Sequence, residues 1–332
     1  MKKKVIAGLV FSTLLVYLSI RGIDFQGVAK GFRTIHYGYL LPALALLFLM
    51  QFLRSYRWGL ILSPLAKIDQ LSLFSVTCVG FLAIVAIPAR LGELARPYLI
   101  AKKSSLKMSA ALGTIIVERV LDSLTVLVIA VFVLFFIPLP PWLVRASVFF
   151  LLATLALLAV MILMILKQEA SLRILATLSG KLPARYAEGM NRFVRHFLQG
   201  FRIMVNPTLL ASVTGLSILI WLIDVLAIYL LFLAFGFHLP AAAAFVLMII
   251  LIIGIAIPTA PGFIGNWHYF CILGLSLFGV PRTDALTFAI VYHALAIGIV
   301  VILGLAFLPF NRFSVADLRR QAQSYTGSDS QG

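Results

Sequence analysis

The chain has 332 residues, of which 62% are hydrophobic and 11% are charged, and its 27 Lys and Arg against 11 Asp and Glu give a formal net charge of +16. Soluble domains carry about 25% charged residues and about half apolar residues. The composition therefore excludes a soluble enzyme or transcription factor. Nucleic-acid-binding domains gather positive charge on a polar folded surface, whereas here it lies in short segments between long apolar runs. This pattern is typical of a multi-pass membrane protein with basic cytoplasmic loops and predicts no nucleic-acid partner.

Six apolar runs are candidates to cross a bilayer as helices, for which about 20 residues are needed. They lie at Val5–Ile20, Tyr39–Gln51 extended to Leu62, Ser109–Ile137, Trp142–Leu166, Leu209–Phe235 and Leu286–Leu308. The first run follows three lysines in the manner of a secretory signal, but residues 19–22 offer no convincing small-x-small cleavage site, so we predict an uncleaved first span. Cys78 and Cys271 lie inside apolar stretches, which favours buried packing residues over a disulfide or a metal site.

Two further apolar regions, Leu71–Lys102 and Pro240–Val280, are interrupted near their middle. The interruptions read Ala-Ile-Pro-Ala-Arg-Leu-Gly at 86–92 and Ala-Ile-Pro-Thr-Ala-Pro-Gly at 256–262. Pro removes a helix hydrogen bond and Gly permits a positive φ, so each helix is expected to stop and turn there. Such a region either crosses the membrane as a broken helix or returns to the side from which it came.

The distribution of positive charge decides between these alternatives, because cytoplasmic loops are enriched in Lys and Arg. If both regions are re-entrant hairpins and the N-terminus is cytoplasmic, most basic residues lie inside, including Arg54, Arg57, Lys67 and the basic stretch 167–202. If Leu71–Ile87 crossed fully, that stretch would face outward. We therefore predict an all-α polytopic membrane protein with six full spans, two re-entrant helical hairpins, about eight hydrophobic segments, and both termini inside.

The two interruptions lie 170 residues apart, about half the chain. Each half would make an odd number of crossings, so the second half would be inverted relative to the first, as in many transporters. We predict one transmembrane domain at 1–320, with halves at about 1–140 and 141–310, and a disordered Ser/Gly/Gln-rich tail at 321–332.

Between the halves, Ala184–Met204 combines an apolar stripe with arginines, which predicts a basic amphipathic helix on the inner leaflet or a solvated loop with one packed face.

Three charged residues, Arg90, Glu93 and Arg96, surround the end of the first interruption. On a helix they would share one face, and a charge at membrane depth costs at least about 2.5 kcal/mol unless it is paired or hydrated. Two arginines for one glutamate leave a surplus positive charge, which suits a phosphate-bearing headgroup because guanidinium groups bind phosphate bidentately. The alternative is an internal Arg–Glu–Arg bridge that holds the hairpin together.

A second charged group, Glu118, Arg119 and Asp122, lies inside the predicted span Ser109–Ile137. Glu118 and Asp122 are four residues apart and therefore share one helix face. Arg119 can neutralise only one of the two acids, so the other needs a further partner, for which Arg90 or Arg96 would serve. The group is either a structural network or part of a substrate or proton path.

The second interruption supplies a third candidate site, formed by Pro261, Gly262, Gly265, Asn266 and His268. A helix that restarts there presents free N–H groups and partial positive charge, which suit anions. His268 and His293 are candidate proton carriers, although a lone histidine of this kind is more often a packing residue. Asp224 either faces the same polar space or caps a neighbouring helix, and Tyr292 precedes His293 in the last span.

Three motifs taken together resemble those of the lysylphosphatidylglycerol synthase transmembrane, or flippase-like, family. They are Pro88-x-Arg90-x-Gly92-Glu93-x-x-Arg96, Glu118-Arg119-x-x-Asp122 and Pro261-Gly262-x-Ile264-Gly265, and they occur in order over nearly the whole chain. The resemblance implies that the six charged residues of the first two motifs line a path for lipid headgroups. Two positions depart from the family pattern, which usually has a glutamate where His268 stands and Tyr-Arg where this chain has Tyr292-His293.

We therefore expect a lipid translocase of the bacterial inner membrane that moves a phospholipid or polyprenyl-linked lipid between leaflets. No P-loop, Gly-x-Ser-x-Gly or His-Glu-x-x-His motif occurs, so we predict no enzymatic activity, cofactor or metal. One alternative is an accessory subunit that presents a lipid to a separately encoded glycosyltransferase or lipid synthase. Another is a secondary transporter of small solutes.

Overall fold

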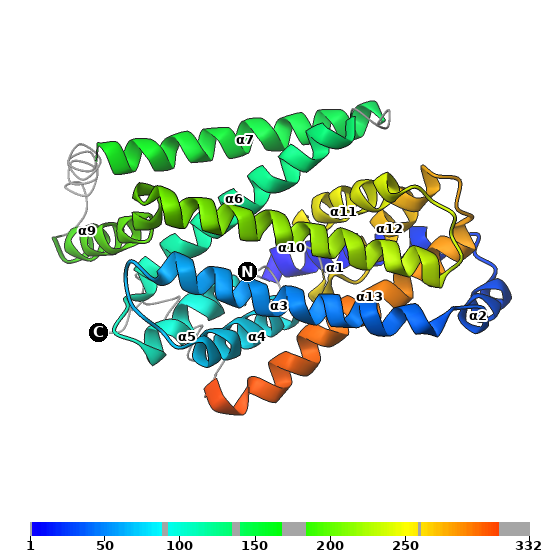
Figure 1. Cartoon of the computed structure of the whole chain (residues 1–332), viewed down its shortest axis with the longest axis horizontal. Helices are drawn as coiled ribbons and strands as arrows, with labels where there is room; N and C mark the ends of the chain where they lie inside the picture. The colour runs from blue at the N-terminus through cyan, green and yellow to red at the C-terminus, as the bar shows by residue number, and fades with distance from the viewer. Residues whose placement is uncertain (1, 88–91, 135–139, 168–183, 258–259, 312–332) are drawn as a thin grey trace.

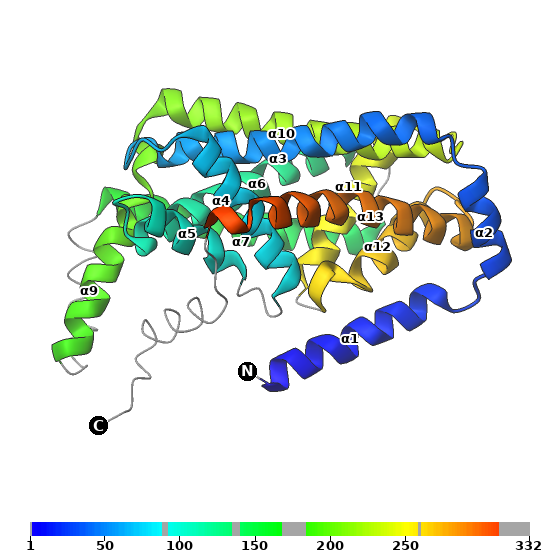
Figure 2. The same ribbon diagram turned by 90° about the horizontal axis from the view of Figure 1, so that it is seen from below.

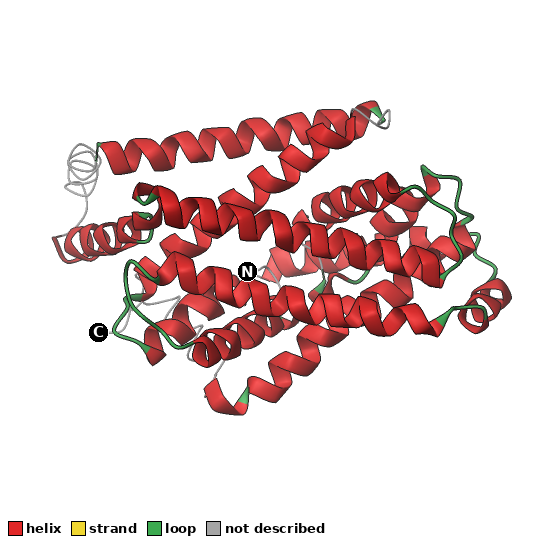
Figure 3. Ribbon diagram, viewed as in Figure 1, coloured by secondary structure: helices red, strands yellow, loops and turns green. Residues whose placement is uncertain are grey.

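The fold is described from a computed structural model over residues 2–87, 92–134, 140–167, 184–257 and 260–311 (Figure 1). Within these ranges the chain forms twelve α-helices and several short 3-10 turns, and it contains no β-strand (Figure 3). The prediction of an all-α architecture is therefore confirmed. The predicted tail at 321–332 lies outside the described residues.

Four helices are long and apolar enough to cross a membrane. They are α3 (Leu40–Leu62, preceded by the 3-10 turn η1, Tyr37–Tyr39), α7 (Pro141–Leu166), α10 (Pro207–Ala234) and α13 (Arg282–Phe307). Each coincides with one of the six predicted spans. α7 lies along one edge of the molecule in Figure 1, and only 11% of its most apolar window is buried, so nearly its whole surface is available to lipid.

The other two predicted spans correspond to helices with distinguishing features. α1 (Lys2–Ile20) and α2 (Phe25–Arg33) would together count as a fifth span, but they are bent by 78° relative to each other. α6 (Met108–Leu134) has 27 residues, a length of about 40 Å at 1.5 Å per residue. It is long enough to cross a bilayer, yet its middle carries the charged group Glu118, Arg119 and Asp122.

Both interrupted regions fold back on themselves as pairs of packed helices, as their Pro and Gly residues predict. α4 (Gln70–Ala86) packs on α5 (Ala95–Lys103), and α11 (Ala241–Ala256) packs on α12 (Asn266–Ser276). In the first pair the chain returns so closely that a Cβ on Gly92 would lie 2.2 Å from the carbonyl oxygen of Ala83. Only glycine allows the backbone of the returning chain to reach α4 at this point.

The predicted amphipathic segment is helical, but the helix is shorter than expected. α9 (Ala184–Gln199) ends before Gly200, and the 3-10 turn η3 (Arg202–Val205) follows. A Cβ on Gly200 would lie 2.5 Å from the carbonyl oxygen of Ala110, so α9 ends in backbone contact with α6. Leu198 and Phe201 are buried there, and this part of the apolar stripe therefore packs on the protein.

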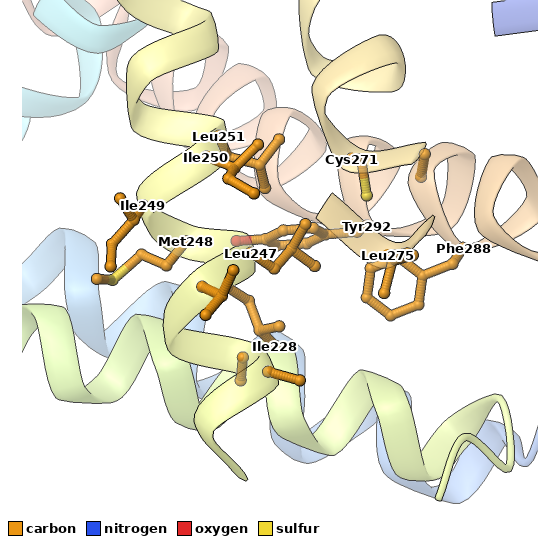
Figure 4. Packing of buried hydrophobic residues seen from close by; sticks show 14 of the residues in the cluster. Ile228, Leu247, Met248, Ile249, Ile250, Leu251, Cys271, Leu275, Phe288 and Tyr292 are labelled. Carbon is orange, nitrogen blue, oxygen red and sulfur yellow. The ribbon is translucent and has the colours of Figure 1, made fainter. Parts of the chain in front are cut away.

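The two halves of the chain make corresponding contacts. In the first half α3 contacts α4, α4 contacts α5, and α5 contacts α6; in the second half α10 contacts α11, α11 contacts α12, and α12 contacts α13. Between the halves α4 packs on α13 and α6 packs on α11, while α3 and α10 lie side by side along the long axis (Figures 1 and 2). The apolar core is divided in the same way. One cluster is built mainly by α10–α13 around Leu247, Phe288 and Tyr292 (Figure 4), a second is built mainly by α3–α6, and a smaller third lies between α3 and α10.

Candidate functional site

Glu118 is the centre of the first polar site. It lies on α6, its side chain is fully buried, and it accepts two hydrogen bonds from Arg96 of α5, from Nη1 at 2.8 Å and from Nη2 at 3.0 Å. The Arg96 guanidinium also lies over the Trp58 ring of α3, 4.2 Å from its centroid. A bidentate ion pair of this kind has defined geometry. Arg96 therefore ties the helix pair α4–α5 to both α3 and α6. It is one of the two arginines that were predicted to serve as a further partner for the acids of α6.

Arg57 of α3 holds the second acid of the site. Its Nη1 and Nη2 donate to the two carboxylate oxygens of Asp122 at 2.5 and 3.1 Å, and Nη1 also donates to Ser217 of α10 at 2.7 Å. The side chain is 1% exposed. The sequence analysis counted Arg57 only among the basic residues of the cytoplasmic side and did not predict its place in this buried group. Arg57 lies in a 23-residue helix, and the five residues that follow it in this helix, 58–62, are all uncharged and apolar. This run was the sequence signal for the burial of Arg57.

Arg119 completes the group, which we call the arginine–carboxylate network: Arg57, Arg96, Glu118, Arg119 and Asp122. Its Nη2 donates to Glu118 at 2.6 Å and lies 3.3 Å from Asp122. Unlike the other members it is open to the outside, with 46% of its side chain exposed. Within these five residues three guanidinium groups face two carboxylates, Glu93 outside the set also attracts Arg119, and the accessible group is the Arg119 guanidinium.

The first predicted cluster is only partly contained in this network. Arg90 lies outside the described residues. Glu93 precedes α5 and lies near enough to Arg119 to attract it electrostatically. Because α5 begins at Ala95, Glu93 and Arg96 do not share one continuous helix face as the sequence had predicted.

The second interruption forms a separate polar site. Gly262 and Gly265 adopt positive φ angles of 71° and 91°, and the 3-10 turn η4 (Pro261–Phe263) lies next to them. The Asn266 side chain donates to the carbonyl oxygens of Gly254 and Ile257 at 2.9 and 3.1 Å, which satisfies the end of α11. α1 closes against this turn, because Ser12 hydrogen-bonds to the carbonyl oxygen of Ile264. These positive φ angles and hydrogen bonds fix the backbone conformation of the turn between α11 and α12.

Two histidines and a carboxylate surround the second site. His293 Nε2 lies 2.7 Å from the carbonyl oxygen of Gly262, and its ring centroid is 4.9 Å from that of His268. The neighbouring Tyr292 donates its hydroxyl to Asp224 of α10 at 3.4 Å. In the described part of the chain no three His, Cys, Asp or Glu residues are arranged to hold a metal ion.

Arg54 of α3 lies between the two sites and was not expected from the sequence. Its guanidinium interacts electrostatically with Asp224 of the second site and with Asp122 of the network. It also lies 5.3 Å from the centroid of the Phe81 ring. Arg54 occurs one turn before Arg57 on the same helix. Its spacing therefore placed it near Arg57, but only the packing of α3 on α10 brings it to Asp224.

Comparison with known proteins agrees with this architecture. The family model of the lysylphosphatidylglycerol synthase transmembrane region matches residues 5–320. The chain belongs to this family. A protein described as a UPF0104 membrane protein from Methanothermobacter thermautotrophicus is 27% identical over 300 residues, which cover 84% of this chain and 87% of the relative. No solved structure matches significantly. The family assignment predicted from the three motifs is confirmed, and the chain is a multi-pass membrane protein of a family linked to lipid handling.

Proposed function

We propose that the chain is a lipid translocase, which moves a phosphate-bearing lipid between the leaflets of a bacterial inner membrane. The observation that carries this proposal is the exposed guanidinium of Arg119 on an otherwise buried network of ion pairs. A charge at membrane depth costs at least about 2.5 kcal/mol unless it is paired or hydrated, and an arginine that served only to bridge buried acids would not need an accessible guanidinium. An anionic headgroup is the partner that such a cation would bind.

The arrangement of the network assigns different roles to its members. Arg57 and Arg96 have their Nη atoms engaged with Asp122 and Glu118, so they position the carboxylates. The carboxylates in turn orient Arg119, which together with Arg90 would hold the headgroup phosphate. Guanidinium groups suit this task because they bind phosphate through two parallel hydrogen bonds. The acyl or polyprenyl tails would remain in the bilayer, so no enzymatic step and no cofactor is required.

The same proposal includes an inverted repeat with six full spans, two re-entrant hairpins and both termini inside. The corresponding helix contacts of the two halves support it, because α3–α6 and α10–α13 can be interchanged without changing which helices touch. The predicted repeat offset also applies, since α4 and α11 end 170 residues apart, at Ala86 and Ala256. Opposed hairpins next to a shared polar region are a common arrangement in transporters.

Reconstitution into liposomes tests the proposal. The purified protein should move a fluorescent anionic phospholipid between leaflets, measured by dithionite quenching. Arg119→Gln should slow the movement by about tenfold or more, because a hydrogen bond to a charged group contributes about 1.5–3 kcal/mol. Arg119→Lys keeps the charge but loses the bidentate geometry, so its translocation rate should lie between those of the wild type and Arg119→Gln. The matched control is Arg145→Gln, an exposed arginine of α7 outside the network.

Equal rates in protein-containing and empty vesicles would refute the translocase proposal. If translocation is absent while a lipid synthase or a glycosyltransferase co-purifies with the protein, the accessory role replaces it. Ion-coupled solute uptake that does not depend on lipid identity would support the secondary carrier instead.

A further inference from the structure

Asp224 differs from the other acids at membrane depth in having no close counter-ion. It lies near the middle of α10, and within the described ranges no Lys, Arg or His nitrogen lies within 4 Å of its carboxylate. Its hydrogen bond from Tyr292 is long, at 3.4 Å. Glu118 and Asp122, in contrast, each receive bidentate hydrogen bonds from an arginine. An ionised carboxylate that lacks such a partner is costly in a membrane, so Asp224 needs another way to be neutralised.

The groups that face Asp224 come from a few helices. α3 contributes Arg54, which attracts the carboxylate from beyond ion-pair distance, and α13 contributes the Tyr292 hydroxyl, followed in sequence by His293. α6 contributes Asp122, whose charge also acts on Arg54. α11 packs on α10 but contains no titratable residue. The two 3-10 turns that contact α10 lie at its ends: η1 contributes only tyrosines, and η3 contributes Arg202 next to the start of α10.

Two buried indole N–H groups without a partner among the described residues occur on the helices that carry or adjoin this carboxyl group. The indole N–H groups of Trp221, one turn earlier on α10, and of Trp267, whose ring contacts Tyr292, are buried without a hydrogen-bond partner in the part of the chain that the structure describes. Buried polar groups are normally satisfied, and water is a common partner where the protein provides none.

We propose that Asp224 is a proton-binding site that couples the movement of an anionic headgroup to the proton gradient; this rests on the proposed translocase function. The carboxylate takes one proton from water on one side of the membrane and becomes neutral, and it releases that proton on the other side. Protonation removes the attraction of Asp224 for Arg54, so the Arg54 charge becomes available to the phosphate together with Arg119. A singly charged phosphodiester and one proton then cross together without net charge.

The first experiment detects the proton itself and does not depend on transport. Infrared difference spectra of the protein in nanodiscs, recorded during a pH titration, should show the stretching band of a protonated carboxylic acid that is lost in Asp224→Asn and shifted in Asp224→Glu. The control is Asp284→Asn, in the first turn of α13, which should keep the band. If the spectrum of Asp224→Asn equals that of the wild type, Asp224 does not exchange a proton and the inference is wrong.

The second experiment measures coupling in proteoliposomes with an imposed pH gradient. Wild-type translocation of the fluorescent anionic lipid should change with the direction of the gradient and should be accompanied by proton movement, read with an internal pH-sensitive dye. Asp224→Asn should lose both responses, while Asp224→Glu and Asp284→Asn should retain them. Translocation that proceeds at one rate whatever the gradient would overturn the coupling and leave the translocase intact. A titrating carboxyl group in a protein that moves no lipid would refute the translocase, and the coupling with it.

Discussion

Replacing Arg57 tests the energetic reasoning behind the arginine–carboxylate network. Arg57→Leu leaves Asp122 without its bidentate partner and removes the donor to Ser217. Removing one member of a buried ion pair costs about 3–5 kcal/mol, because the remaining charge stays buried without compensation. Arg119 lies 3.3 Å from Asp122 and recovers part of this loss, so we expect the free energy of unfolding to fall by about 3 kcal/mol, the lower end of that range.

A second replacement, Asp122→Leu in the Arg57→Leu background, distinguishes two causes of the stability loss. One is the lost attraction between Arg57 and Asp122, and the other is the unpaired charge that remains on Asp122. If the cost comes from the unpaired carboxylate, the double variant should be more stable than Arg57→Leu alone, because the buried charge is then absent. The measurement is equilibrium unfolding in mixed micelles by titration with SDS. The control is Lys67→Leu, at an exposed site, which should change stability by no more than about 0.5 kcal/mol. A double variant that is no more stable than Arg57→Leu would refute the reasoning.

Three further predictions concern residues outside the network. Gly92→Ala should greatly reduce the yield of folded protein on size-exclusion chromatography, because the added Cβ would lie 2.2 Å from the carbonyl oxygen of Ala83. Asp69→Ala should lower the unfolding free energy by about 1 kcal/mol, since Asp69 caps α4 by accepting the Ser72 N–H at 2.8 Å. That bond lowers the pKa of Asp69, so its contribution is present above the pKa of the unfolded chain and should be lost as the pH falls through the folded pKa in an unfolding series. Cys271 is fully buried and should react with a maleimide only after denaturation.

The sequence was most informative where local chemistry determines the structure. Pro and Gly in the two interruptions predicted where α4 and α11 end, because these residues act on the backbone of their own segment. Charge balance predicted that Arg90 or Arg96 would serve one of the two acids of α6, and Arg96 pairs with Glu118. The roles of Arg54 and Arg57 depend instead on how α3 packs against α6 and α10, and helix periodicity does not report which helices become neighbours. Both arginines therefore entered the sequence analysis only as basic residues of the cytoplasmic side and not as members of a site.

The polar contacts of the two halves differ in strength, although the helices that carry them correspond. α5 is held through Arg96, which combines a bidentate ion pair with a ring contact to Trp58, whereas α12 is held by the Asn266 hydrogen bonds and by ring contacts of Trp267 and His268. Local opening of α5 must break a buried charge pair, and opening of α12 need not.

Because segments with weaker buried contacts open first, we expect the second hairpin to be the one that moves. Hydrogen–deuterium exchange in nanodiscs should therefore show faster amide exchange in peptides from α12 (Asn266–Ser276) than in peptides from α5 (Ala95–Lys103). Glu118→Gln should raise exchange in α5 toward the α12 level, because it replaces the carboxylate that binds Arg96 with a neutral amide. Asp284→Gln, at a half-buried position in the first turn of α13, serves as the control and should leave both unchanged. Slower exchange in α12 than in α5 would show that ring packing and the Asn266 bonds hold the second hairpin more firmly than the ion pair holds the first.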